Sequence, residues 1–198
     1  MTFNSVVELV QEFTSDRRRL GVVLENLPAY GGTALHDAVI EGLALVHSLP
    51  SEGKALVIIT DGADTVSGSS LKDALTAARR EETPIYSIGL GHRRPHGGFG
   101  ADDDFDDRPL RKLAEETGGD AEILLDVEHH HRGEVDRIKE AAESVALALR
   151  HRYVLAYYPP AAAGPPQWKE IRVEVDRPSV TVRARKGYYA AETRSSLQ

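Results

Sequence analysis

The chain has 198 residues, and 24 Lys and Arg against 31 Asp and Glu give a net charge of −7 with histidine neutral. A chain of this length buries about 70% of the surface that its unfolded form exposes, so it can form a hydrophobic core without metal or disulfide support. The absence of cysteine excludes thiol catalysis, cysteine-ligated metals and disulfides. The acidic balance argues against nucleic-acid binding, which needs clustered Lys and Arg.

Neither a membrane span nor a signal peptide is expected in the chain as given. No apolar run approaches the roughly 20 residues that cross a bilayer. Residues 1–5 contain neither a basic stretch nor the start of an apolar one. The sequence leaves the cellular compartment open.

The first 60 residues alternate short apolar runs with turn residues. Residues 6–10 are expected to form a strand, and residues 15–27 a helix capped by Ser15 or Asp16. A second helix is expected over residues 35–49, with Thr33 as its cap. Residues 55–59 are apolar at every position, which is typical of a strand with helices on both faces and neighbours on both edges.

The same alternation continues to residue 150. Its expected elements are a helix over 70–80 with a Ser70/Asp73 capping box, a strand over 84–90, a helix ending at Gly118-Gly119, a strand over 121–126 and a helix over 134–150. Alternating strands and helices indicate βαβ units. We therefore predict an α/β fold with a Rossmann-like, doubly wound, mostly parallel sheet.

The pattern changes after residue 152. Residues 153–158 are expected to form a strand, and residues 171–175 and 180–185 alternate apolar with charged side chains, as in an antiparallel hairpin. The predicted domains are an α/β domain over 1–152, a β appendage over 153–190 and a disordered tail over 191–198.

Two residues stand out as candidate ligands at the carboxyl ends of the strands, where open α/β sheets bind their ligands. Asp61 follows the strand at 55–60, and its carboxylate suits a hard cation such as Mg²⁺ or the amides of a turn. Thr33 opens a helix, where its hydroxyl can ligate a cation, help to hold an anion or cap the helix. Gly32, Asp64 and His92 form the expected rim of this site.

Several short motifs occur in a characteristic order. They are Gly-Gly-Thr-x-Leu at 31–35, Thr-Asp-Gly-x-Asp at 60–64, Pro-Ile-Tyr-Ser-Ile-Gly at 84–89 and Leu-x-x-Leu-Ala-Glu-Glu-Thr-Gly-Gly at 110–119. Together with the tail segments 153–159 and 182–189, this order resembles the von Willebrand factor type A domain, in its bacterial VWFA-related variety. The resemblance implies a doubly wound sheet with a metal-ion-dependent adhesion site, where Mg²⁺ or Mn²⁺ binds a partner's carboxylate.

Two residues of this chain match that family site: Thr33 matches its threonine ligand and Asp61 its second-loop aspartate. The Asp-x-Ser-x-Ser motif and the family's first two strands have no counterpart here, so an N-terminally incomplete domain is expected. One hydroxyl and one carboxylate make a poor Mg²⁺ site, because Mg²⁺ prefers six oxygens. The predicted cofactor is therefore a divalent cation that binds this chain weakly or not at all.

The expected function is non-enzymatic protein binding, in adhesion or complex assembly, with a partner that offers an acidic residue. The edge of the sheet beside residues 55–60 is expected to pair with residues 6–10, with the C-terminal hairpin, or with another chain or a missing segment. The alternative is a hydrolase or phosphotransferase that uses Gly31-Gly32-Thr33 as an anion cradle and Asp61 as an acid–base group. A structural domain without any ligand is the third possibility.

Complete members of the family that the motifs resemble are often exported.

Overall fold

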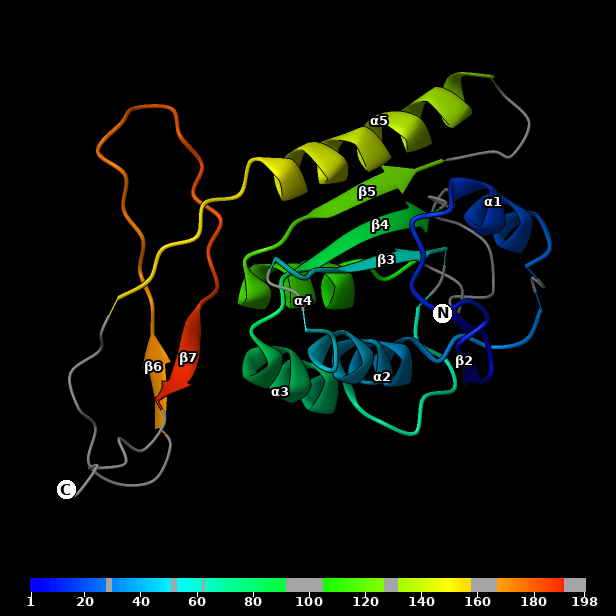
Figure 1. Cartoon of the computed structure of the whole chain (residues 1–198), viewed down its shortest axis with the longest axis horizontal. Helices are drawn as coiled ribbons and strands as arrows, with labels where there is room; N and C mark the ends of the chain where they lie inside the picture. Colours follow the sequence, from blue (N-terminus) through cyan, green and yellow to red (C-terminus); the bar gives the residue numbers. More distant parts are fainter. Residues whose placement is uncertain are drawn as a thin grey trace, which may run out of the picture.

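The structure is a computed structural model, and it describes residues 1–27, 30–50, 53–61, 63–91, 105–126, 132–157 and 167–190. Its centre is a three-stranded parallel sheet in the order β3 (Leu56–Thr60), β4 (Ile85–Gly91) and β5 (Ala121–Leu125). One face is covered by α2 (Leu35–His47), α3 (Leu71–Glu81) and α4 (Arg108–Thr117), and the other by α5 (Arg132–Arg150) (Figure 1). This arrangement confirms the predicted α/β, Rossmann-like fold class.

Strand β4 divides the core into two halves because successive side chains of a strand point to opposite faces. Ile85 packs among the buried residues of α2, α3 and α4, which include Leu43 and Leu113, both 0% exposed. Tyr86 and Ile88 pack on the other face, against α5. Each face of β4 is thus buried by helices, as expected for the central strand of a parallel sheet.

The predicted helix ends of the α/β region are confirmed where polar groups define them. Asp16 caps α1 (Arg17–Glu25) by accepting the amides of Arg18 and Arg19. Ser70 and Asp73 form the predicted capping box of α3, and each side chain accepts the backbone amide of the other residue. Gly118 ends α4 with a φ of 76°, a conformation that costs glycine little.

The N-terminal strand is shorter than predicted. Thr2–Phe3 (β1) and Val7–Glu8 (β2) form a two-residue antiparallel pair that does not join the central sheet. The Asn4 side chain accepts the Val6 amide at 3.0 Å, and this local turn directs β2 back along β1. The prediction of a strand over 6–10 was therefore wrong at Val6, Leu9 and Val10.

The prediction that residues 55–59 are buried on both faces was also wrong. Val57 is 42% exposed and Ile59 is 58% exposed, while Ile58 between them is buried. Helix α5 packs over β4 and β5, so the α5 face of β3 is open. Among the described residues β3 pairs only with β4, and neither residues 6–10 nor the C-terminal hairpin adds to its other edge.

The C-terminal part contains an antiparallel pair, but not at the predicted residues. The paired strands are β6 (Gln167–Glu170) and β7 (Gly187–Ala190), instead of 171–175 and 180–185. Residues 153–157 pair with no strand that the structure describes. The Trp168 and Tyr189 rings meet at 5.1 Å on this pair, and Arg79 of α3 lies 5.4 Å from the Trp168 ring centre. Aromatic packing near α3 accompanies this pairing. Residues of the predicted strand 180–185 instead contact the end of α4, where Arg185 forms an isolated antiparallel bridge with Thr117.

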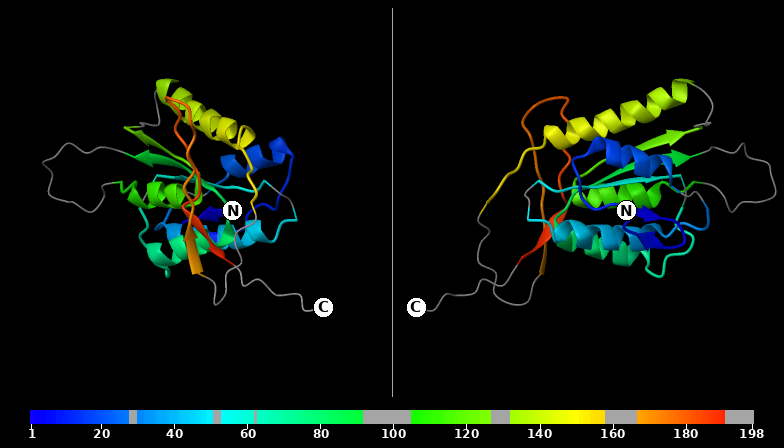
Figure 2. Two further views of the ribbon diagram at one scale, coloured as in Figure 1. Left: turned by 90° about the vertical axis from the view of Figure 1, so that its left-hand side faces the viewer. Right: turned by 45° about the vertical axis from the view of Figure 1, so that its right-hand side comes forward.

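This C-terminal arm (residues 153–157 and 167–190) stands at the end of the sheet where the strands begin (Figures 1 and 2). Arg183, Arg185 and Lys186 form ion pairs with Asp120, Glu82 and Glu115 of the α/β region. The carboxyl ends of the strands lie at the opposite end. No helix in the described part of the chain is long and apolar enough to cross a membrane.

A buried carboxylate links α3 and α4 beneath the arm. The Glu116 side chain is 8% exposed and accepts a hydrogen bond from Arg79 Nε at 2.9 Å, while Lys112 Nζ lies at 3.1 Å. The Arg79 guanidinium, with Lys112 beside it, lowers the pKa of Glu116 below its ordinary value of 4.5. The charged form of Glu116 is therefore more stable in the folded chain than in the unfolded chain.

We expect Glu116→Gln to flatten the acid limb of the stability profile. Because the pKa of Glu116 is lower in the folded chain, its carboxylate stabilises the fold fully above the pKa of the unfolded state. That stabilisation is lost as the pH falls through the folded-state pKa. Urea unfolding of both proteins from pH 7 downward should show the wild-type advantage shrinking below about pH 4.5. Arg79→Met, which removes the cause, should flatten the same limb; curves that stay parallel to the wild type for both variants would contradict this assignment.

Candidate functional site

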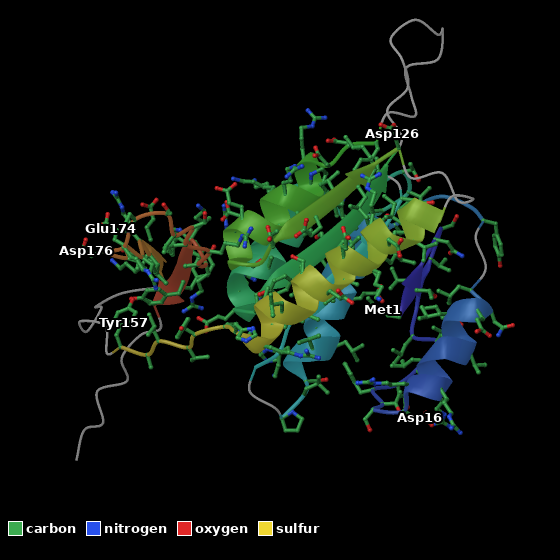
Figure 3. The ribbon with its side chains drawn as sticks, turned by 90° about the horizontal axis from the view of Figure 1, so that it is seen from above. Met1, Asp16, Asp126, Tyr157, Glu174 and Asp176 are labelled. Atoms are coloured by element: carbon green, nitrogen blue, oxygen red, sulfur yellow. The ribbon has the colours of Figure 1, made fainter. Side chains whose placement is uncertain are left out.

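The carboxyl ends of the strands carry a polar loop that folds onto the start of α2. This loop, residues 63–69, follows β3 and Asp61. Two hydrogen bonds join Thr33 and Thr65. The Thr65 amide donates to the Thr33 carbonyl at 2.9 Å, and the Thr33 amide donates to Thr65 Oγ1 at 2.8 Å. The segments that carry Thr33 and Asp61 therefore meet at one end of the sheet. Figure 3 labels Asp126, which follows β5 at this end, and Tyr157, Glu174 and Asp176 at the other.

The backbone amides at the start of α2 already have acceptors within the protein. Those of Gly32, Thr33, Ala34, His36 and Asp37 donate, in that order, to Ser5 Oγ, Thr65 Oγ1, the Asn4 carbonyl, Asp64 Oδ1 and Ser67 Oγ, at 2.8 to 3.2 Å. A phosphate would have to displace several of these groups to bind the helix N-terminus. The arrangement therefore counts against the anion cradle of the enzyme alternative.

The start of α2 is capped by Asp64 and not by Thr33, for which this role was predicted. The N-cap position of α2 is Ala34, which has no capping side chain, so the prediction for Thr33 was wrong. The Asp64 carboxylate accepts the His36 amide at 3.1 Å and the Ser67 hydroxyl, and its Oδ2 lies 3.3 Å from His36 Nδ1. A negative side chain at this position also interacts favourably with the helix dipole.

Asp37 holds the far end of the loop. Its carboxylate accepts the amides of Gly68 at 2.8 Å and Ser69 at 3.0 Å. Hydrogen bonds from the Ser69 side chain and from these amides lower the pKa of Asp37 below its ordinary value of 3.8. The loop is therefore bonded to α2 at both of its ends: Asp64 of the loop accepts the His36 amide, and Asp37 of α2 accepts the Gly68 and Ser69 amides.

The remaining predicted site residues differ in what surrounds them. Asp61 is exposed, and Thr33 is half-buried. Gly32 lies so close to the loop that a Cβ there would stand 2.5 Å from Val66 Cγ1, so only glycine fits without movement. His92 lies outside the described residues, as does Gly62.

One carboxylate on the expected rim of the cation site is already bonded within the protein. The Asp64 carboxylate is engaged by His36 and Ser67, which leaves the Thr33 hydroxyl and the Asp61 carboxylate as the predicted donors. Mg²⁺ requires near-octahedral oxygen coordination. No three Asp, Glu, His or Cys side chains converge within the ranges that the structure describes.

Sequence reasoning placed Asp64 on the rim but missed its capping role, and it missed Ser5, Thr65 and Ser67 altogether. A signal was present in the run Asp64-Thr65-Val66-Ser67, since Asp, Thr and Ser accept backbone amides readily. The acceptors lie about 30 residues from their donors in the chain. A pattern for local capping does not find partners at that separation.

We expect Asp64→Ala to lower the free energy of unfolding by about 1 to 2 kcal/mol, as for the loss of a strong helix cap. The substitution leaves the His36 amide and the Ser67 hydroxyl without their acceptor. Asp61→Ala is the matched control, because it removes an exposed carboxylate that lies just before the loop and should change stability by less than about 0.5 kcal/mol. Equal urea midpoints for the two variants would show that Asp64 does not hold the helix.

Comparison with known proteins gave matches among solved structures only; no family model and no curated protein matches the chain. A von Willebrand factor type A protein from Catenulispora acidiphila matches with 19% identity and a TM-score of 0.48, over 68% of this chain and 28% of that one. BatB from Bacteroides thetaiotaomicron, a conserved hypothetical protein, matches with 18% identity and a TM-score of 0.42, over 66% of this chain and 71% of that one.

A third match is an uncharacterized membrane-spanning protein from Vibrio fischeri, with 20% identity and a TM-score of 0.34. It covers 66% of this chain and 67% of that one. The chain spans less than a third of the Catenulispora protein, so the whole activity of that protein does not transfer to it. The matched structures thus include one whose description names the family that the motifs resemble, and it aligns with 68% of this chain.

Proposed function

We propose that this chain is a non-enzymatic protein-binding module of the von Willebrand factor A type, which acts in adhesion or complex assembly. The partner contacts the surface around Thr33 and Asp61. One observation carries the proposal: the loop after β3 is bonded to Thr33 through Thr65, so a rigid polar surface with an exposed carboxylate lies at the carboxyl end of the sheet. Ligands of open α/β sheets bind at this end.

The hydrogen bonds at α2 favour a protein partner over a phosphate substrate. The five amides at the helix start are already bonded to Ser5, Asn4, Asp64, Thr65 and Ser67, so they are not open to a phosphate. A protein partner needs no such cradle, because it gains affinity from contact area and from a few anchoring side chains. A cation contributes weakly to this binding, since Thr33 and Asp61 supply only two of the oxygens that Mg²⁺ requires.

The test is selection of displayed peptides on the immobilised chain, with and without Mg²⁺. Selected peptides are then measured against Asp61→Ala and Thr33→Ala, with Asp136→Ala as control because Asp136 is an exposed carboxylate on α5. We expect binding to fall in the first two variants and to persist in the control and without Mg²⁺. Peptides that bind all variants equally would reject this surface as the binding site.

Two further measurements separate the alternatives. Thermal stabilisation by phosphate, or turnover of generic phosphoester substrates, would support the hydrolase or phosphotransferase instead. Isothermal titration with Mg²⁺ or Mn²⁺ that shows tight one-to-one binding, abolished by Asp61→Ala, would contradict the weak cation site proposed for this chain. A chain that responds to no peptide, cation or phosphate would be the purely structural domain.

A further inference from the structure

Strand β3 has an open edge without the usual protection of edge strands. It pairs with β4 on one side, and among the described residues no strand pairs with the other. The run Leu56-Val57-Ile58-Ile59 contains no charge and no proline, the features that commonly keep other strands from adding to an edge. Val57 and Ile59 remain 42% and 58% exposed on its α5 face. This edge is therefore suited to an apolar strand.

The chain itself contains an apolar segment without a strand partner. Residues 153–157 begin three positions after the end of α5 and join none of the described sheets. Tyr153, Val154 and Leu155 are 90%, 82% and 80% exposed, so both faces of the segment are open to water. Exposing apolar area of this extent is unfavourable, and pairing along β3 would remove part of it from water.

One hydrogen bond brings the starts of the two segments together. Arg152 Nη1 donates to the Lys54 carbonyl at 3.1 Å, immediately before each apolar run begins. If the segment continues from this point beside β3, Leu155 stands next to Val57 and Tyr157 next to Ile59. Both pairs lie on the face of the sheet where Val57 and Ile59 are exposed, so four apolar side chains would cover one another.

The path that this pairing requires obeys the rule for parallel sheets. The connections from β3 to β4 and from β4 to β5 cross on the face of α3 and α4, whereas α5 lies on the other face (Figure 1). A connection from β5 through α5 back to the β3 edge runs across the sheet in the opposite direction and on the opposite face. Because both are reversed, this crossover has the same handedness as the other two. Right-handed crossovers are nearly universal in such sheets.

We propose that residues 153–157 form a strap that closes on β3 as a fourth, parallel strand of the sheet in the same chain. Closure exchanges the contact of Tyr157 with Tyr188, whose ring centres are 6.1 Å apart, for contacts along β3. Nine residues separate Tyr157 from Gln167, and a chain of this length extends to about 30 Å. If the chain binds a protein partner as proposed above, the closed strap shuts this edge to a strand of that partner.

The experiment uses two introduced cysteines, because the natural chain has none. In Val57→Cys/Leu155→Cys the two thiols lie side by side when the strap is closed. Dibromobimane becomes fluorescent when it bridges two neighbouring thiols, and the bridged chain is separated by size. Val57→Cys/Val154→Cys is the matched control, since Val154 is equally exposed but would point to the opposite face of the new strand.

We expect the Leu155 variant to bridge severalfold faster than the Val154 variant, as a monomer. Equal rates would mean mere proximity of a free segment, and absence of bridging would mean that the strap does not close; either result overturns the proposal. Bridging confined to a dimer fraction would also overturn it, in favour of a second copy at this edge. The experiment contains no partner, so failure of the strap and failure of peptide binding around Asp61 are distinguished.

Discussion

Gly119→Ala should destabilise the chain by about 3 kcal/mol or more, because a side chain at this position has no space. A Cβ built on Gly119 would lie 1.8 Å from the Ile85 carbonyl oxygen and 2.6 Å from its carbonyl carbon. Both atoms belong to the backbone of β4, whose Ile85 is 0% exposed and bonded through its amide to Thr117 Oγ1 at 2.9 Å. The start of β4 would have to move away from the turn after α4.

Thermal or urea unfolding measures this effect. Gly21→Ala is the control: no atom lies within 4 Å of a Cβ at Gly21, in the exposed helix α1. Alanine in a helix is favoured over glycine by about 1 kcal/mol, so this control should be neutral or stabilising. A Gly119→Ala protein as stable as the wild type would show that the turn is looser than described.

Leu43→Ala should cost about 2 to 5 kcal/mol, the range found for large-to-small changes in a core. Leu43 is 0% exposed at the centre of α2 and belongs to the core cluster that includes Ile58 of β3 and Ala74 of α3. Removing its side chain leaves a cavity between the helix that carries the candidate site and the sheet. The loss should therefore appear in both global stability and hydrogen-exchange protection of α2.

Leu24→Ala provides the comparison for Leu43→Ala. Leu24 is 67% exposed on α1, so its truncation should change the free energy of unfolding, measured in urea, by less than about 0.5 kcal/mol. If both leucine variants lost equal stability, the helix α1 would be packed in solution against a surface that it does not touch in this structure.

The α/β region was predictable because its signals are local. Periodic apolar spacing, the Ser70/Asp73 capping box and Gly118 at the end of α4 each act within a few residues, and the structure contains all three. The continuous apolar run of residues 55–59 was correctly identified as a strand of a parallel sheet. The expectation that this strand is buried on both faces was wrong, because burial depends on neighbouring elements that the sequence of one strand does not specify.

The candidate site shows the same division. The sequence by itself predicted that Thr33, at the start of a helix, and Asp61, at the end of a strand, would lie at the carboxyl end of the sheet, where open α/β sheets bind their ligands. It did not determine which groups bond to the start of α2. Asp64, Thr65 and Ser67 cap this helix from about 30 residues away, and their approach depends on how α2 packs against β3 and α3.

Only the tertiary structure decided the pairing at both ends of the chain. Alternating residues at 171–175 and 180–185 are compatible with a hairpin, but the ladder forms at β6 and β7, where Trp168 meets Tyr189 and Arg79. Strand propensity depends on the surface that a strand covers, and this surface is built by distant residues. The sequence thus determined the helices, strands and strand direction, while long-range packing decided the caps, the pairing partners and the open edge of β3.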